Sequence, residues 1–298
     1  MEQHTNQENK KHWYDKNYKK LLVIPVVLLI ICISYLMYFY SQNGDIIYKD
    51  PSLSGGTTIT LRTESDAKNL ELSLKKSLED VYVRTISDIS TGKQIAVLID
   101  SSEKPEVLEP LIEEITGQKL TDENSSIEFS GPSLGNNFYR QLIIAVIISF
   151  VLMSLVIFFL FRTLIHSVAV IFAALSDIIM AIAVVDFFGF RLSAAGIAAF
   201  LMLIGYSVDT DILLTTRVLK KRGEPVNSRI YGAFKTGMFM TLTGLIAVIP
   251  AFLIVTGLPD SFRQIFLILA IGLSADILNT WLTNASIIKW YAVHKKLD

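Results

Sequence analysis

The chain has 298 residues, of which 51% are hydrophobic and 18% are charged; its formal net charge is −1 and its mean hydropathy is +0.46. Soluble domains carry about a quarter charged residues, so this composition excludes an ordinary soluble enzyme. Most charges lie in residues 1–20, 62–128 and 217–235, and long stretches elsewhere carry almost none. This block pattern is typical of a membrane protein with one polar domain.

The sequence offers few residues for metal or nucleotide chemistry. Cys32 is the single cysteine and lies in the first apolar run, so the chain has no internal disulfide and no cysteine metal site. The four histidines are scattered, and no glycine loop with a following lysine is present to bind a phosphate. We therefore expect no cofactor, no metal, no nucleic-acid partner and no conventional enzyme activity.

Six apolar segments are long enough to cross a bilayer, which takes about 20 residues of helix. The first is too long for the apolar core of a cleavable signal peptide, about 7–15 residues, and is expected to be a retained anchor. No Lys or Arg interrupts these segments. The expected spans are Leu21–Tyr40, Gln141–Phe161, Leu164–Phe187, Ser193–Leu214, Thr236–Val255 and Gln264–Ile288.

Basic residues predict the orientation of these spans. They precede the first span, fill the loop between the fourth and fifth spans, and close the chain, whereas the short loops on the other side offer only Arg191 and Arg263. The positive-inside rule therefore places both termini and the 215–235 loop in the cytoplasm, and contact with anionic lipid is a smaller additional role. The basic residues are Lys10, Lys11, Lys16, Lys19, Lys20, Arg217, Lys220, Lys221, Arg222, Arg229, Lys235, Lys289, Lys295 and Lys296.

Residues 41–138 form the only polar block and are expected outside the membrane. Alternating β-branched residues predict strands at 57–63, 81–89, 94–100 and 126–129. Helical spacing predicts helices at 65–78, with Ser65 as N-cap, and at 104–115. The order β-α-β-β-α-β is that of ferredoxin-like domains. The fold class is thus a bundle of six transmembrane helices with an inserted α+β domain. The expected boundaries are a tail at 1–20, a helix at 21–40, the outer domain at 41–138, five helices at 139–291 and a tail at 292–298.

Acidic residues within the apolar spans are the informative ones. Asp177, Asp209, Asp211 and Asp276 lie within three spans, and an acid at the centre of a span costs about 3 kcal/mol on insertion scales. Because these spans contain no Lys or Arg, the acids have no counter-charge of their own, and a proton relay is predicted. Asp209 and Asp211 are two residues apart and point to nearly opposite sides of one helix, so only one of them can face the interior.

Other interpretations of these acids remain open. Neutral Asp side chains can simply hydrogen-bond neighbouring helices. Two membrane aspartates can also form a protease dyad that shares one proton, although the surrounding sequences here, Leu175–Asp177 and Tyr206–Asp209, lack the Tyr-Asp and Gly-x-Gly-Asp patterns of such proteases. A small-molecule pump is a further alternative, but a lone six-helix unit offers no obvious substrate cavity.

Three motifs resemble the SecF family, the smaller partner in the SecDF protein-export complex, and the likeness is closer to archaeal members. The first follows the first span, the second precedes the second span, and the third lies in the fourth span. They are Asp50–Thr57 (DPSLSGGT), Ser130–Gly135 (SGPSLG) and Gly205–Asp211 (GYSVDTD). The resemblance covers nearly the whole chain.

The resemblance implies roles for individual residues. The acid of the bacterial signature aligns with Thr210, and the Val208-Asp209 pair is more like the SecD version. The proton-handling role is therefore assigned to Asp209 first, then to Asp211, and to Asp177 as the acid of the third span. Residues expected to support helix packing are Gly205, Ser207 and Thr210, and the candidate hinge or turn residues are Gly55, Gly56, Gly131, Pro132 and Gly135.

The resemblance also implies partners. A SecF-type chain is expected to pair with SecD in a pseudo-symmetric assembly of the resistance-nodulation-division type, at the cell membrane. This assembly would help a translocating polypeptide across the Sec channel, driven by the proton gradient, with lipid as its surroundings. A passive subunit that stabilises SecD and the channel without carrying protons is the alternative.

Overall fold

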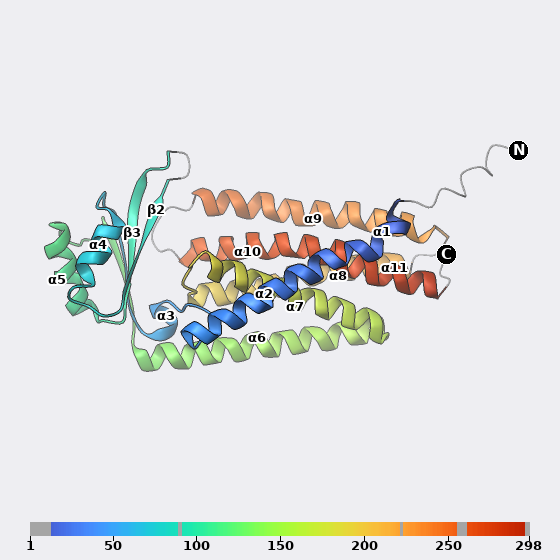
Figure 1. Ribbon diagram of the computed structural model, residues 1–298, viewed down its shortest axis with the longest axis horizontal. Coiled ribbons are helices and arrows are strands. Elements are labelled where there is room, and N and C mark those ends of the chain that lie inside the picture. The colour runs from blue at the N-terminus through green and yellow to red at the C-terminus, as the bar shows by residue number, and fades with distance from the viewer. Residues whose placement is uncertain (1–12, 89–90, 221–222, 255–260, 296–298) are drawn as a thin grey trace, which may run out of the picture.

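The computed structural model describes residues 13–88, 91–220, 223–254 and 261–295. A bundle of long helices carries a small sheet domain at one end (Figure 1). The beginning of α1 (Trp13–Leu21) and the end of α11 (Ala285–His294) lie at the opposite end of the bundle. Residues 1–12 and 296–298 of the tails expected at 1–20 and 292–298 lie outside the described residues, and so do Lys221 and Arg222. The basic residues Lys10, Lys11 and Lys296 fall within these parts of the tails.

Six helical spans in the described part of the chain are long and apolar enough to cross a membrane, which confirms the predicted number. The first joins α1 to α2 (Val23–Asn43), and the last runs through α10 (Ser261–Leu278), a π-helix η1 (Asn279–Asn284) and α11. Between them lie four single helices. These are α6 (Pro132–Phe161), α7 (Leu164–Phe187), α8 (Ala194–Lys220) and α9 (Val226–Ile254).

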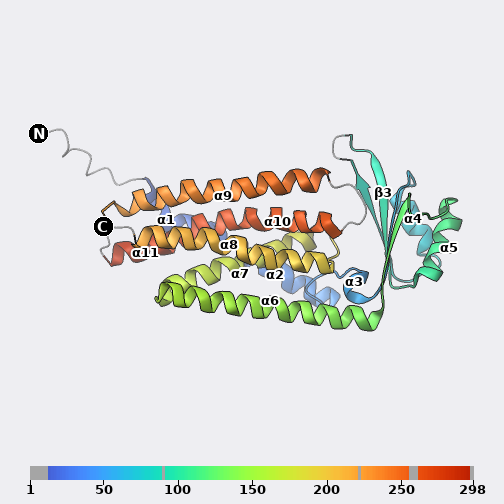
Figure 2. The same ribbon diagram turned by 180° about the vertical axis from the view of Figure 1, so that it is seen from behind.

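The bundle has two different faces. On one face α2 crosses the bundle diagonally (Figure 1) and packs mainly against α7. On the other face α8 packs most closely against α10 and also contacts α9 and α6, with no further helix over it among the described residues (Figure 2). The α8 face is therefore open along the length of the bundle.

The sheet domain has four antiparallel strands in the order β2-β3-β1-β4, which is the predicted split βαβ arrangement. Helices α4 and α5 cover the face of the sheet that is turned away from the bundle (Figure 1), and their leucines pack on Ile59, Val97 and Ile99. The elements are α3 (Pro51–Ser54), β1 (Gly56–Leu61), α4 (Ala67–Leu74), β2 (Val81–Ser87), β3 (Gln94–Ser101), α5 (Pro105–Thr116) and β4 (Ser125–Ser130).

Some local predictions about the starts of helices were wrong. The N-cap of α4 is Asp66, whose carboxylate accepts the Asn69 N–H at 3.1 Å, and not Ser65. Helix α6 begins at Pro132, well before the expected Gln141, because proline is favoured in the first turn of a helix and the polar residues after it do not interrupt the helix. The second span thus continues beyond its apolar part as far as the sheet domain.

Candidate functional site: an acid cluster inside the bundle

Three acids from three helices meet in the middle of the bundle. Asp177 of α7, Asp211 of α8 and Asp276 of α10 are each 0% exposed. Each lies on the face of its helix where small and apolar residues recur at helical spacing, and packing of those faces brings the acids together. The tertiary structure therefore joins three carboxyl groups that are far apart in the sequence.

Hydroxyl and amide groups hold Asp177 at both of its oxygens. Ser207 Oγ donates to Oδ2 at 2.5 Å, and Asn279 Nδ2 donates to Oδ1 at 2.6 Å. A carboxyl group removed from water is stable only when such donors replace its hydration. Asp177 is thus the most completely satisfied acid of the cluster.

A single hydroxyl lies between the other two acids. Thr280 Oγ1 is 2.9 Å from Asp211 Oδ1 and also 2.9 Å from Asp276 Oδ1. Because a threonine hydroxyl carries one proton, it can donate to only one of these carboxyl groups at a time. When it donates to one acid, its oxygen can accept the proton of the other. The geometry therefore links the protonation states of Asp211 and Asp276 through Thr280.

Thr210 places a second hydroxyl beside Asp276. Its Oγ1 lies 3.1 and 3.2 Å from the two oxygens of Asp276, 3.4 Å from Thr280 Oγ1 and 2.9 Å from the Ser207 carbonyl oxygen. Ser207 in turn contacts Asp177. Thr210 contacts the backbone carbonyl of Ser207, so the connection to Asp177 runs instead through the Ser207 hydroxyl, which contacts Asp177 and lies beside Asp276.

The π-helix η1 supplies donors that the sequence interpretation missed. Asp276, Thr280 and Asn284 are spaced by four residues, and in an α-helix of 3.6 residues per turn this spacing drifts around the axis. The wider i→i+5 turn of a π-helix offsets the drift, so that Asn284 Nδ2 also reaches Asp211 Oδ1, at 2.6 Å. The signal in the sequence was the run of Asn and Thr residues at 279–284 within an apolar span.

Asp209 does not join this cluster. It is exposed on the outer side of α8, as are Gly205 and Tyr206, the latter with 57% exposure. Of the residues expected to support packing, Ser207 and Thr210 lie in the cluster and Gly205 lies on the outer face. The structure therefore brings Asp211 and Asp177 together, as two of the three predicted relay residues, and leaves the first-ranked one on the open α8 face.

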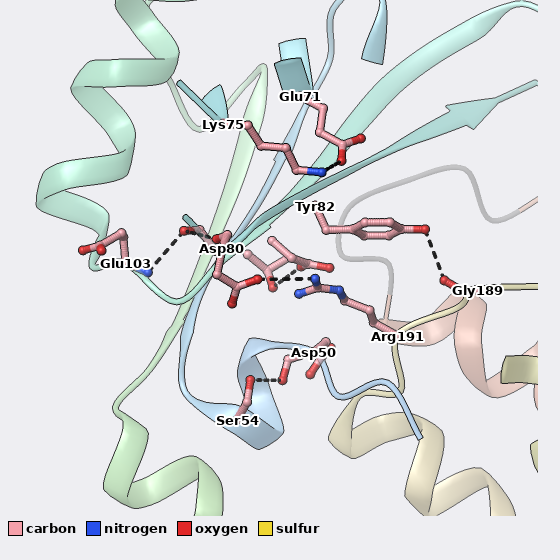
Figure 3. Close-up of polar contacts among 12 residues, drawn as sticks. Asp50, Ser54, Glu71, Lys75, Asp80, Tyr82, Glu103, Gly189 and Arg191 are labelled. Atoms are coloured by element: carbon pink, nitrogen blue, oxygen red, sulfur yellow. Dashed lines mark hydrogen bonds and ion pairs between the residues drawn. The ribbon is translucent and has the colours of Figure 1, made fainter. Parts of the chain in front are cut away.

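The loop between α7 and α8 fastens the acid-bearing helices to the sheet domain. Arg191 extends from this loop toward Asp80 and the ring of Tyr82 (Figure 3), with its guanidinium 3.7 Å from the Asp80 carboxylate and 4.8 Å from the Tyr82 ring centroid. The Tyr82 hydroxyl donates to the Gly189 carbonyl oxygen at 3.2 Å. Side chains of β2 and of the turn before it thus hold the α7–α8 loop through an ion pair, a cation–π contact and a hydrogen bond.

The same loop pairs with the segment that enters the sheet domain. Leu192 N–H donates to the Tyr48 carbonyl at 2.6 Å, and Asp50 N–H donates to the Leu192 carbonyl at 3.0 Å. Ala194 N–H donates to Ser52 Oγ at 3.1 Å, and that hydroxyl donates to the Asp50 carboxylate at 2.5 Å. Burial, and to a smaller extent the nearby Asp100, raises the pKa of Asp50 to about 7, although the hydroxyl and N–H of Ser52 act against this rise.

The predicted hinge residues form a tightly packed contact. Gly55 and Gly56 have φ of +88° and +131°, a region that residues other than glycine adopt with strain. Their role as a hinge stays a prediction. A Cβ on Gly55 would lie 2.3 Å from Pro132 Cα, and one on Gly135 would lie 2.7 Å from the Gly55 nitrogen. The expected separate turn at 131–135 is wrong, because Pro132 and Gly135 belong to the first turns of α6.

A different buried acid lies in the sheet domain. Asp100 of β3 is 0% exposed, accepts the Thr58 hydroxyl at 2.8 Å, and lies 3.7 Å from the guanidinium of Arg84. Arg84 is a partly buried cation from the neighbouring strand β2. Asp100 therefore has a positively charged neighbour. The donors described above for the acids of the bundle are neutral hydroxyl and amide groups.

Residues 111–294 match the family model described as protein export membrane protein SecD/SecF, C-terminal. The chain belongs to the SecD/SecF family. It is 37% identical to the protein-export membrane protein SecF of Methanolacinia petrolearia, with 94% of this chain and 97% of the relative covered. It is 36% identical to SecF of Methanocaldococcus jannaschii, with 93% and 96% covered. Both relatives are archaeal, as the motifs indicated.

The SecDF fold is also found among solved structures. The crystal structure of SecDF, a translocon-associated membrane protein from Thermus thermophilus, matches with a TM-score of 0.76 at 18% identity. The match covers 96% of this chain but 39% of the SecDF chain, so this chain spans about two fifths of that protein. A super-membrane-facing form of SecDF matches with a TM-score of 0.59. The chain is thus a multi-pass membrane protein of a protein-export family, built as a SecDF-like helical unit with an inserted sheet domain.

Proposed function

We propose that this chain is the SecF-type subunit of a SecDF complex that uses the proton gradient to assist polypeptide translocation through the Sec channel. The observation that carries the proposal is the bridge formed by Thr280 between Asp211 and Asp276. A hydroxyl that contacts two carboxyl groups lets a proton pass from one to the other with small movements of the side chains. The gradient supplies about 2.3 kcal/mol per charge per 100 mV.

The buried acids take the leading role in this proposal. Asp211 and Asp276 exchange the proton through Thr280, and the Ser207 hydroxyl, which contacts Asp177 and lies beside Asp276, extends the path to Asp177. Asp209 has a separate part, because its carboxyl group lies near the middle of α8 on the outer side of the helix. Exposure of a carboxylate to hydrocarbon is costly, so this position calls for a protein neighbour with polar groups.

The neighbour that fits the open α8 face is a second six-helix unit of the SecD type. This chain corresponds to about two fifths of the solved SecDF chain, so most of that protein has no counterpart here. Gly205 beside Asp209 offers little bulk and permits close helix approach. In this arrangement Asp209 receives its hydrogen-bond partners from SecD and handles a proton at the contact between the two units.

The orientation follows from the basic residues. The beginning of α1 and the end of α11 lie at the end of the bundle opposite the sheet domain (Figure 1). The lysines of these two helices lie at the same end. We place that end in the cytoplasm and the sheet domain outside. The α7–α8 loop then transmits changes in Asp177 and Asp211 to the sheet domain through Arg191 and Tyr82. The sheet domain would thereby act on the exported polypeptide.

The test compares two buried acids, Asp211 of α8 and Asp276 of α10, with the exposed Asp209 of α8. Export of a secreted reporter is measured in cells that carry Asp211→Asn, Asp276→Asn or Asp209→Asn, with membrane levels of the chain and of SecD followed alongside. Asn keeps size and hydrogen bonding but cannot release a proton. We expect Asp211→Asn and Asp276→Asn to reduce export at least 10-fold, and Asp209→Asn to reduce it less and to weaken co-purification with SecD.

A relay and a passive subunit give different results in this experiment. Normal export by Asp211→Asn and Asp276→Asn, with the complex intact, would remove the proton proposal and leave a chain that stabilises SecD and the channel. The full hydrogen bonding of Asp177 is the observation that favours this second candidate. Membership of an export family favours either role over the intramembrane protease.

A further inference from the structure

A large cleft opens on the side of the bundle opposite the open α8 face. It lies between α1, the beginning of α9, and the η1–α11 segment, and its volume is about 820 Å³. Binding pockets for small molecules measure about 300–1,000 Å³, so the cleft has room for a sizeable ligand. The residues that line it and carry the argument are Tyr14, Leu21, Asn227, Ser228, Phe234 and Trp281.

The lining changes from polar to apolar along the bundle axis. Asn227 and Ser228 lie in the first turn of α9, at the end of the bundle, and Tyr14 lies in the first turn of α1. Phe234 follows Ser228 by six residues, about 9 Å along the helix, and its ring packs edge-on against Trp281 at 5.1 Å between centroids. The apolar end of the cleft thus points toward the middle of the membrane.

A buried cation lies behind the polar end. The ammonium of Lys289, a residue that is 1% exposed, contacts Asn227 Oδ1 at 2.7 Å and lies 4.2 Å from the ring centroid of Tyr14. Both of these contacts line the cleft. The exposed lysines Lys16, Lys19 and Lys20 of α1 add positive charge at the same end. This end of the cleft therefore favours an anionic group.

We propose that the cleft binds one anionic phospholipid. Its acyl chain lies along Leu21, Phe234 and Trp281, and its phosphate lies at the Asn227–Ser228 end near the Lys289 ammonium. This polarity is that of a lipid in the leaflet at the terminal end of the bundle, where headgroups meet basic residues. The lipid does not compete with a partner on α8, because α8 opens on the opposite face.

The position of the cleft gives the lipid access to the acid cluster. Trp281 forms part of its wall and is the neighbour of Thr280 in η1, the residue between Asp211 and Asp276. The Trp281 ring also packs against Gly237 so closely that a Cβ on that glycine would lie 2.4 Å from it. Because this wall has little free space, a bound acyl chain would fix the position of the π-helix that donates to the acids.

The experiment measures lipid binding to the full chain in detergent by native mass spectrometry. The chain is delipidated and then titrated with dioleoylphosphatidylglycerol, or with dioleoylphosphatidylcholine as the zwitterionic lipid with the same acyl chains. We expect one saturable site, with at least fivefold tighter binding of the phosphatidylglycerol. Ser228→Phe places a ring in the polar end and is expected to weaken binding at least 10-fold.

A matched variant controls for added bulk on the same helix. Ala247→Phe introduces the same ring at an exposed position of α9 that does not line the cleft, and it is expected to bind as the parent does. The thermal midpoint of each variant in detergent shows that it is folded. Binding without saturation, equal affinities for the two lipids, or equal binding by Ser228→Phe and the parent would each overturn the proposal.

Discussion

Two buried carboxyl environments in this chain differ in what surrounds the acid. Asp100 of the sheet domain has Arg84 beside it and a threonine hydroxyl as donor. The bundle acids Asp211 and Asp276 share the hydroxyl of Thr280 and receive hydroxyl and amide donors, and no ion pair with either is found in the described part of the chain. A cation stabilises the charged form of an acid, whereas a shared hydroxyl serves either form. The first arrangement suits structure and the second suits proton exchange.

The largest expected change in stability comes from removing the cation beside Asp100 in the sheet domain. Arg84→Met leaves the Asp100 carboxylate buried without its cation, and loss of one partner of a buried pair costs about 3–5 kcal/mol. Hydrogen exchange of the β1 and β3 amides in the full chain measures this loss. The double variant Arg84→Met with Asp100→Asn is the control and should recover most of it. Unchanged exchange in the single variant would mean that Asp100 does not depend on Arg84.

Asp50 provides an intermediate case at the junction, with a pH dependence. Its folded-state pKa is raised to about 7, so its contribution to stability is complete below the ordinary pKa of about 4, decreases as pH rises, and is lost above about 7. Between pH 5 and pH 8 the parent should lose about 3 kcal/mol more stability than Asp50→Asn, which cannot titrate and retains the N-cap. Thermal unfolding of the full chain in detergent at both pH values measures the difference. Parallel pH profiles for the two chains would contradict the expectation.

The shared hydroxyl of the second environment is tested by a pair of substitutions. Thr280→Val keeps the shape of the side chain but leaves Asp211 and Asp276 without their common donor, which costs about 1–3 kcal/mol for an unsatisfied buried group. Thr280→Ser retains the hydroxyl and is the matched control. We expect reporter export to fall with Val and to persist with Ser, with both chains present in the membrane. Equal export by the two variants would show that the hydroxyl does not carry the proton.

An exposed ion pair is expected to give the smallest change in stability among the charged groups compared. Lys75 contacts Glu71 one helical turn earlier on α4, and both side chains are partly open to solvent. Surface pairs of this kind contribute about 0.5 kcal/mol or less. Lys75→Met should therefore leave the exchange of the β1 and β3 amides unchanged within error. A loss comparable to that of Arg84→Met would mean that exposure is a poor guide to the energy of charges in this domain.

Local patterns predicted most of the fold. Six apolar segments, the glycines at Gly55 and Gly56, and the strand and helix order of the outer domain all depend on residues close in the chain. The start of α6 at Pro132 was missed because the polar residues before Gln141 mark the edge of the hydrocarbon and not the end of the helix. Hydropathy therefore locates a span but does not delimit the helix that contains it.

For the candidate site too, some features were predicted from the sequence and others depend on helix packing. The acids within the spans were visible as costly residues, and the opposite directions of Asp209 and Asp211 followed from two residues of helical rotation. Which of the two faces the interior depends on how α8 packs against α7 and α10. The helices turn Asp211 inward, toward Thr280 and Asn284, and leave Asp209 on the open face.

The sequence by itself determined that the chain crosses a membrane, carries one β-α-β-β-α-β domain and has acids within its spans, because hydrophobicity and periodicity are properties of neighbouring residues. Only the tertiary structure decided which acids meet and which groups hold them. Thr280 lies four residues from Asp276 but 69 from Asp211, and the packing of η1 against α8 brings its hydroxyl to both acids. Such a contact depends on helix rotation and packing, which act between segments far apart in the chain.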